Sequence, residues 1–378
     1  MHERKSGIIF SGEPQTTGHT LLPIILRRYI MKAAVLTEYR KIEWKDVPEP
    51  VTGDSEVLVK VTYASICGTD QHIFNGEFHP RTTLPLIPGH EFVGTIADMG
   101  KNVSGYSLGE RVAVDPIIWC GTCPACEIHH YPACTSLKLL GIDMDGAFAE
   151  YVTAKSSMLY RIADSISDRD SALVEPYSIG FHASKRAGVQ KNDTIAIYGA
   201  GKIGQSIMQA ARTITRNTLF IVDVVEKRLE IAKKACPDII TINAREADPV
   251  EVIRDRTNGR GVDIAFEAAG KALEIKGRYH PVRQAIHSIR GAGKVCVLSL
   301  ENTEVPLVMK ELIWKEGLIV TSRVSHGEYR DALEHLAIGD LHPVTMISSI
   351  MPMSEAQRAF EMIEREPENY LKVLLTNE

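Results

Sequence analysis

A glycine-rich turn follows a short apolar run in the stretch Thr194-Ile195-Ala196-Ile197-Tyr198-Gly199-Ala200-Gly201-Lys202-Ile203-Gly204. The run is nearly continuous, as expected for a parallel strand that is buried on both faces. The turn has the form G-x-G-x-x-G and leads into a helical pattern at about residues 203–213. Short strands and helices then alternate to about residue 318. This alternation predicts the α/β class, with a doubly wound parallel sheet.

The glycines of this turn suit a dinucleotide. Gly199 permits the tight turn, and Gly201 lets the backbone approach a pyrophosphate at the helix N-terminus. Gly204 lets the helix pack against the sheet. We assign Lys202 and Ile203, within the same turn, to the cofactor-binding set.

An acidic residue after the second strand bears on which dinucleotide is bound. Asp223 ends that strand, 19 residues after Gly204. Its carboxylate can accept hydrogen bonds from an adenosine ribose and would repel a 2′-phosphate, which favours NAD over NADP. The cationic residues Lys227 and Arg228 follow closely and weaken this preference for NAD. We include Arg228 in the cofactor site.

Outside this region the chain has a different character. Residues 31–152 contain short strands broken by glycine and proline, which indicates an all-β, barrel-like domain. From about residue 319 a strand, a helix and a closing strand should return to that domain. We therefore predict a poorly ordered extension at residues 1–30, a β domain at 31–182 and 319–378, and the parallel-sheet domain at 183–318.

Composition bounds the kind of partner. The chain has 378 residues, a net charge of −5 and a pI near 6.2. Neither nucleic acid nor an anionic membrane is expected from this charge. No apolar run approaches the roughly 20 residues that span a bilayer. We expect a cytoplasmic protein, in which crowded cysteines favour metal binding or catalysis over disulfides.

Four cysteines lie within fifteen positions at Cys120, Cys123, Cys126 and Cys134. Four thiolates at this spacing can surround one zinc ion tetrahedrally, with Zn–S distances of about 2.3 Å. Such a site leaves no position for substrate, so its role is structural. An iron–sulfur cluster, which also accepts four thiolates, is an alternative.

A second constellation is dispersed along the chain. Cys67 follows one predicted strand, His90 and Glu91 precede another, and Glu175 lies near the junction with the second domain. One cysteine, one histidine and one or two carboxylates suit a second zinc ion with an open coordination position.

Together these motifs resemble the zinc-containing medium-chain alcohol and polyol dehydrogenases, over nearly the whole chain from Met31. The resemblance implies a GroES-like catalytic domain, a Rossmann domain with NAD, two zinc ions and a homo-dimer or homo-tetramer. It makes Cys67 and His90 ligands of the catalytic zinc and Glu91 a direct or exchanging ligand, and it leaves open whether Glu91 or Glu175 binds the metal directly. Asp70 would hold the ring of His90.

The resemblance also implies the chemistry. An alcohol would be oxidised by hydride transfer to NAD, while Thr69 accepts the alcohol proton. The proton would reach solvent through the cofactor ribose or His72.

The substrate is a small molecule whose identity the sequence narrows only in part. Residues 174–183 resemble sorbitol dehydrogenases, whereas 111–116, 140–142 and 321–324 resemble a bacterial subgroup that includes L-galactonate and L-gulonate 5-dehydrogenases. Arg323 could pair with a substrate carboxylate, which favours a sugar acid. Threonine, sorbitol or butanediol dehydrogenase is an alternative, and a non-catalytic NAD-binding regulator is an answer of another class. The basic segment 271–290 is expected to be a solvated loop.

Overall fold

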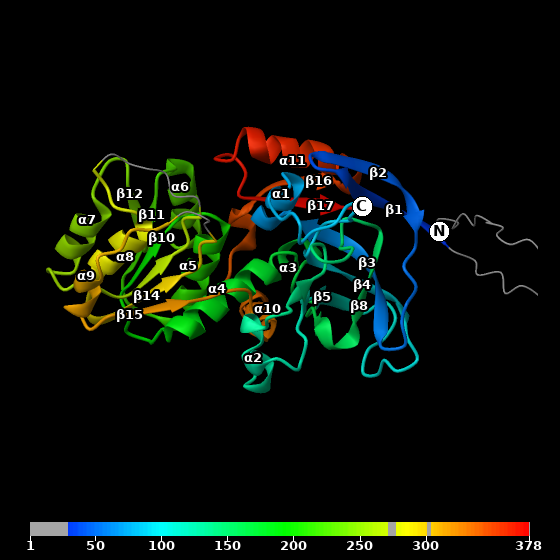
Figure 1. The fold of residues 1–378 in the computed structure, drawn as a ribbon, viewed down its shortest axis with the longest axis horizontal. Helices are drawn as coiled ribbons and strands as arrows, with labels where there is room; N and C mark the ends of the chain where they lie inside the picture. Colours follow the sequence, from blue (N-terminus) through cyan, green and yellow to red (C-terminus); the bar gives the residue numbers. More distant parts are fainter. Residues whose placement is uncertain (1–28, 271–276, 301–303, 378) are drawn as a thin grey trace, which may run out of the picture.

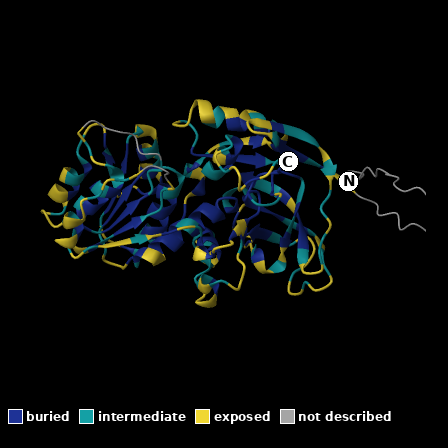
Figure 2. Ribbon diagram, in the orientation of Figure 1, coloured by how far each residue is buried: buried dark blue, intermediate teal, exposed yellow. Residues whose placement is uncertain are grey.

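The computed structural model describes residues 29–270, 277–300 and 304–377. Figure 1 shows two lobes, with helices α4 (Val174–Ala187) and α10 (Tyr329–Ala337) between them. The central strands of both lobes are mostly buried, while the outer helices carry exposed faces (Figure 2). No helix in the described ranges is long and apolar enough to cross a membrane.

One lobe is built on a six-stranded parallel sheet with the order β12-β11-β10-β13-β14-β15. From β10 the chain adds β11 and β12 on one side and then returns to add β13, β14 and β15 on the other. This is a doubly wound order, and it confirms the predicted α/β class. Every residue of β10 is buried because helices cover both faces of the sheet. The strands are β10 (Ile195–Tyr198), β11 (Leu219–Asp223), β12 (Ile240–Asn243), β13 (Val262–Glu267), β14 (Ile289–Val297) and β15 (Leu318–Thr321).

Two hydrophobic clusters lie on the two faces of this sheet. Ile207 and Leu229 belong to one cluster, and Ile253 and Ile286 to the other. Helix α4 joins the first cluster through Ala183, so it packs beside the helix that follows the glycine turn. The helices of this lobe are α5 (Lys202–Ile214), α6 (Glu226–Ala235), α7 (Pro249–Arg256), α8 (Pro281–Ser288) and α9 (Met309–Ile313).

The basic segment 271–290 is not the solvated loop that we expected, as far as it is described. Residues 271–276 lie outside the described part, but α8 occupies most of the remainder. Its apolar residues Val282, Ala285 and Ile286 are buried against the parallel sheet. Arg283 lies on the other side and pairs with Glu311 at 2.7 Å. Arg283 therefore marks the outer face of a packed helix.

The other lobe is built on a mixed sheet with the order β16-β17-β3-β4-β5-β9, in which β8 also pairs with β3. Strand β17 runs antiparallel to β3, so the C-terminal strand belongs to the same lobe as the first strands of the chain. The strands are β3 (Glu56–Ser65), β4 (Glu91–Met99), β5 (Arg111–Val114), β8 (Tyr151–Lys155), β9 (Leu159–Arg161), β16 (Ile347–Pro352) and β17 (Lys372–Thr376).

Smaller elements complete this lobe. They are the hairpin β1 (Ile30–Glu38) and β2 (Lys41–Pro48), the ribbon β6 (Ile117–Ile118) and β7 (Lys138–Leu139), and the helices α1 (Gly68–Phe74), α2 (Pro124–Glu127), α3 (Asp168–Ser171) and α11 (Ala356–Arg365).

Two of the domain limits differ from the expected ones. Strand β15 pairs with β14, so residues 319–321 lie in the parallel sheet and the chain leaves that lobe only after Thr321. Residues 1–28 of the expected extension lie outside the described part, and Ile30 already pairs with Pro48 in the first hairpin.

Candidate active site

The first candidate metal ligand, Cys67, lies between strand β3 and helix α1. It occupies the N-cap of α1 in an extended conformation. The Asp70 carboxylate accepts a hydrogen bond from the Cys67 backbone N–H at 2.7 Å. This contact closes the start of the helix and fixes Cys67 at the end of the strand.

His90 lies one residue before strand β4, next to Cys67. The preceding Gly89 has φ of +98°, and a Cβ there would meet the Phe148 ring at 2.4 Å, so only glycine lets the chain turn here. Nδ1 of His90 lies 3.2 Å from Oδ1 of Asp70. Burial lowers the pKa of His90, but Asp70 and Cys67 outweigh it and hold that pKa well above its ordinary value. Asp70 thus lies where it can orient the ring, as the resemblance implied.

Glu91 forms an ion pair with Lys372, a residue that the sequence analysis missed. Its carboxylate accepts hydrogen bonds from Ser65 and from the buried ammonium of Lys372. Burial raises the pKa of Glu91, but Lys372 and His90 outweigh it and bring that pKa below its ordinary value. The only sequence signal was a lysine at the start of an apolar strand, and only the pairing of β17 with β3 shows its position.

The ligand atoms of Cys67, His90 and Glu91 all lie within 4.8 Å of one another. One thiolate, one imidazole and one carboxylate fit a zinc ion that keeps an open position. Glu175, in the first turn of α4, is close enough to influence the site but is not in this group of three. Its Oε2 is buried with no hydrogen-bond partner in the described part. Burial and the nearby Glu91 raise the pKa of Glu175 well above its ordinary value.

Two further predicted residues lie on α1. Thr69 is half-buried between Gly68 and Asp70. His72 is solvent-exposed, with 55% of its side chain accessible, and its Nδ1 lies 2.6 Å from Oε2 of Glu77. The helix thus leads from the half-buried Cys67 to the surface at His72.

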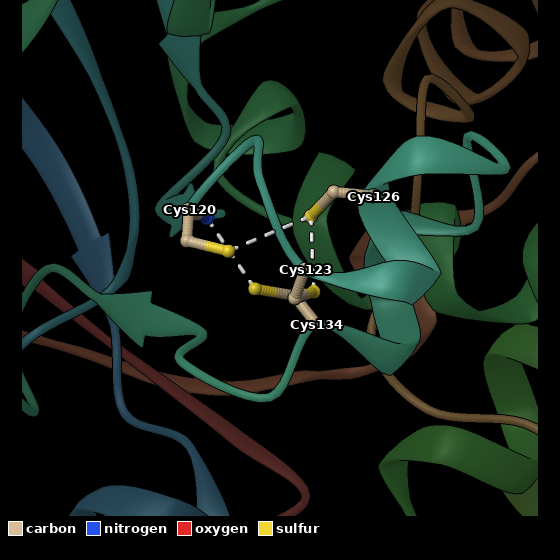
Figure 3. A group of neighbouring side chains, drawn as sticks. All are labelled: Cys120, Cys123, Cys126 and Cys134. Carbon is tan, nitrogen blue, oxygen red and sulfur yellow. Dashed lines mark hydrogen bonds between the residues drawn. The ribbon is translucent and has the colours of Figure 1, made fainter.

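The four clustered cysteines converge on one point (Figure 3). Sγ of Cys126 lies 3.9 Å from Sγ of Cys120 and 3.6 Å from Sγ of Cys123. A tetrahedral zinc with bonds of about 2.3 Å requires sulfur separations of about 3.8 Å. Backbone N–H groups of Thr135 and Cys126 lower the pKa of Cys123 to about 6, which favours the thiolate. The cysteines therefore fit one closed metal site.

The glycine turn lies between β10 and α5, as predicted. Gly199 has φ of +102°, and a Cβ there would meet the Ala268 carbonyl oxygen at 2.6 Å. A Cβ on Gly204 would lie 1.8 Å from the Gly199 carbonyl oxygen, so the helix packs closely on the turn. Apart from its chain neighbours, no described residue comes within 4 Å of a Cβ built on Gly201, the N-cap of α5. This open space at a helix N-terminus fits a dinucleotide phosphate. Ile203 is half-buried against the core of the lobe.

Asp223 stands at the end of β11 beside this turn. Its Oδ2 accepts a hydrogen bond from the Ala200 N–H at 2.6 Å, and its Oδ1 accepts one from the Val225 N–H at 2.9 Å. Arg228 lies 3.9 Å from this carboxylate and donates to the Pro367 carbonyl at 3.1 Å. Asp223 is thus held in place beside the turn, with Arg228 close by.

Arg323 has its described contact with the four-cysteine loop. It is exposed on the segment between β15 and α10, and its Nη1 lies 3.5 Å from the Pro132 carbonyl oxygen in the four-cysteine loop. Its guanidinium therefore faces that loop.

Comparison with known proteins agrees with this geometry. Residues 53–164 match the family model of the alcohol dehydrogenase GroES-like domain, and residues 203–337 match that of the zinc-binding dehydrogenases. Sorbitol dehydrogenase from Bacillus subtilis (strain 168) is 35% identical over 349 residues, which cover 91% of this chain and 97% of the relative.

Two further relatives extend the comparison. The 2-dehydro-3-deoxy-L-galactonate 5-dehydrogenase of Pseudoalteromonas atlantica is 31% identical, over 83% of this chain and 89% of its own. A structure described as a short chain alcohol dehydrogenase (rspB) from E. coli CFT073, complexed with cofactor NADH, has a TM-score of 0.83 and 28% identity, over 92% of this chain and 99% of that chain. The chain therefore belongs to the zinc-containing medium-chain alcohol and polyol dehydrogenases, which join a GroES-like domain to a Rossmann-type domain.

Proposed function

We propose that this enzyme oxidises a secondary alcohol of a polyol or sugar acid with NAD, in the manner of L-galactonate or L-gulonate 5-dehydrogenases. One observation carries the proposal: Cys67, His90 and Glu91 group within 4.8 Å, at the helix that faces the dinucleotide turn. Across that space, Nζ of Lys202 lies 3.6 Å from a Cβ built on Gly68. Metal ligands and cofactor turn thus meet at one place.

Each residue of the site has a role in this reaction. Zinc and NAD, when bound, supply an electrophile for the alcohol oxygen and an acceptor for hydride. Cys67, His90 and Glu91 hold the metal, and Asp70 orients the ring of His90. Glu175, whose Oε2 has no described partner, is available to bind zinc directly or through water.

The proton leaves along helix α1. Thr69 accepts it from the alcohol with its hydroxyl oxygen as it donates its own proton to the cofactor ribose or to His72, from which it passes to solvent. The 2.6 Å contact between Nδ1 of His72 and Oε2 of Glu77 holds this imidazole in place at the surface, where it can exchange a proton with solvent.

A sugar acid is our first choice of substrate. Arg323 presents an exposed guanidinium whose described contact is the neutral Pro132 carbonyl, so it remains able to pair with a carboxylate. The galactonate-type relative supports this choice, and the sorbitol dehydrogenase supports a neutral polyol. Oxidation of threonine or butanediol is the next alternative. A non-catalytic NAD-binding regulator would not need the open position beside Cys67 and His90.

Two zinc ions per subunit and a preference for NAD complete the proposal. The second ion belongs to the four clustered cysteines. Asp223 supports NAD because its carboxylate beside the glycine turn would repel a 2′-phosphate.

We further infer a homo-oligomer. Strand β15 is an edge of the parallel sheet, with Leu318 54% and Ile319 36% exposed. Ile313 and Trp314, close by in sequence, are 68% and 79% exposed. An apolar edge strand is a template for pairing, and a second copy can offer the same edge.

The test is NADH formation on a panel of L-galactonate, L-gulonate, sorbitol, galactitol, butanediol and L-threonine, each with NAD and with NADP. The native protein should oxidise an aldonate, and Cys67→Ala should abolish turnover. Turnover of neutral polyols alone would reject the sugar-acid assignment. Silence across the panel, with zinc and NADH bound, would favour the regulator.

A further inference from the structure

Lys202 is the first residue of helix α5, yet its side chain reaches the other lobe. Its Nζ lies 3.6 Å, and its Cε 3.9 Å, from the position that a Cβ would take on Gly68. Gly68 is the first residue of α1 and follows the metal ligand Cys67. The lysine therefore spans the space between the cofactor turn and the metal site.

The ammonium of Lys202 lacks a counter-charge in direct contact. Among residues 29–270, 277–300 and 304–377, no side chain or carbonyl forms a hydrogen bond or ion pair with its Nζ. The side chain is half-buried, and burial lowers the pKa of Lys202 despite the attraction of Cys67. A partly buried cation without a partner is costly unless a ligand supplies the negative charge.

A second source of positive potential lies next to this cation. Gly201 caps α5 without a side-chain hydrogen bond, so the first N–H groups of α5 remain available for a ligand. The space beside Gly201 is open, as a Cβ there would meet no described atom within 4 Å apart from its neighbours in the chain. The helix dipole and the ammonium therefore both favour an anion in the same space.

We propose that Lys202 pairs with the diphosphate of the dinucleotide and holds it between the N-termini of α5 and α1. The glycines of the turn explain only how the backbone approaches the phosphates. Lys202 adds a charge on the side of the cleft where Gly68 leaves room for it. This inference rests on the proposed cofactor and not on the proposed substrate.

The test measures binding rather than turnover. NADH, ADP-ribose and adenosine are titrated calorimetrically into the zinc-loaded native protein, Lys202→Gln, Lys202→Arg and the exposed control Lys191→Gln. Lys202→Gln should weaken NADH and ADP-ribose about tenfold, the loss expected for one charge-assisted hydrogen bond. Adenosine, which lacks the diphosphate, should bind as before. Lys202→Arg should stay within about threefold of the native affinity, and the control should match the native protein.

Salt provides an independent readout. Native affinity for ADP-ribose should fall more steeply with added sodium chloride than that of Lys202→Gln, because one ion pair is missing in the variant. Zinc content is measured for every variant, so that a change at Cys67 is not mistaken for a lost phosphate contact.

Three results would overturn the proposal. Unchanged affinity of Lys202→Gln for both NADH and ADP-ribose would show that the ammonium does not meet the diphosphate. An equal loss for adenosine would indicate a deformed cleft. Unchanged NADH affinity with a raised KM for anionic substrates alone would assign Lys202 to the substrate. If the substrate panel is silent while NADH binds, the proposed function fails and the binding comparison still decides the role of Lys202.

Discussion

Replacing Lys372 with methionine should expose how the metal site depends on a buried charge. Lys372 begins strand β17, and its ammonium pairs with Glu91 while lying 3.0 Å from Oγ of Ser65. The two charged side chains are 0% and 1% exposed. Methionine keeps most of the side-chain volume but removes the positive charge. Glu91 then remains buried without its main counter-charge.

The size of the effect follows from this burial. Removal of one partner of a buried ion pair costs about 3–5 kcal/mol, because the other charge stays uncompensated. For domains of this size, 1 kcal/mol corresponds to about 2–4 °C, so the melting temperature should fall by roughly 10 °C. Zinc held by Cys67, His90 and Glu91 would supply positive charge in place of Lys372. The loss should therefore be larger in protein stripped by a chelator than in zinc-loaded protein.

Thermal melts and urea titrations, each with zinc and with chelator, measure this difference. The double variant Lys372→Met/Glu91→Gln removes the orphan charge and should recover at least half of the lost stability. The control is Lys60→Met, which changes an exposed lysine on the neighbouring strand β3. The reasoning is refuted if Lys372→Met is no less stable than this control, or if Glu91→Gln restores nothing.

Three other outcomes follow from the structure. Cys126→Ser should remove one zinc ion per subunit by metal analysis and make the four-cysteine loop sensitive to protease, while Cys67 retains its metal. Burial raises the pKa of Asp115 to about 7, so the folded state holds a proton that the unfolded state releases, and stability falls by up to about 4 kcal/mol as the pH rises from about 4 to about 7. Asp115→Asn should escape this loss, and urea titration should show it more stable than the native protein at about pH 8 but not at about pH 4. Asp223→Ser should weaken NAD about tenfold in calorimetric titrations and leave NADP less affected, because it removes a carboxylate that a 2′-phosphate would face.

The parts of the site that spacing alone predicted have residues close together in the chain, whereas the joining of Cys67 with His90 and Glu91 as zinc ligands was implied by the family resemblance. The glycine turn needs only a strand and the helix after it, and the four cysteines lie on one loop. Cys67 and Asp70 share the first turn of α1. In each case local backbone geometry brings the functional groups together, so spacing alone was informative.

The residues that the sequence analysis missed depend on long-range pairing. Lys372 reaches Glu91, 281 positions away, only because β17 lies beside β3. Segment 271–290 was interpreted as a loop because of its many basic residues. The spacing of Val282, Ala285 and Ile286, which fits one helical face, was overlooked. The hydrogen bonding of β15 to β14 likewise decided which sheet contains residues 319–321.

The charged residues of the site come from both lobes, so the site is complete only where the lobes are in contact. Glu91 lies in the mixed-sheet lobe and already has a cation in Lys372. Glu175 lies on α4, which packs against the helix of the glycine turn, and its Oε2 has no described partner. Lys202 comes from the parallel-sheet lobe and reaches Gly68 in the other. Glu91 and Lys372 balance each other within one lobe, whereas the raised pKa of Glu175 and the ammonium of Lys202, unpaired among the described residues, leave a metal ion and an anionic ligand to complete the set between the lobes. The metal ligands and the cofactor turn therefore become one site only where the two lobes meet.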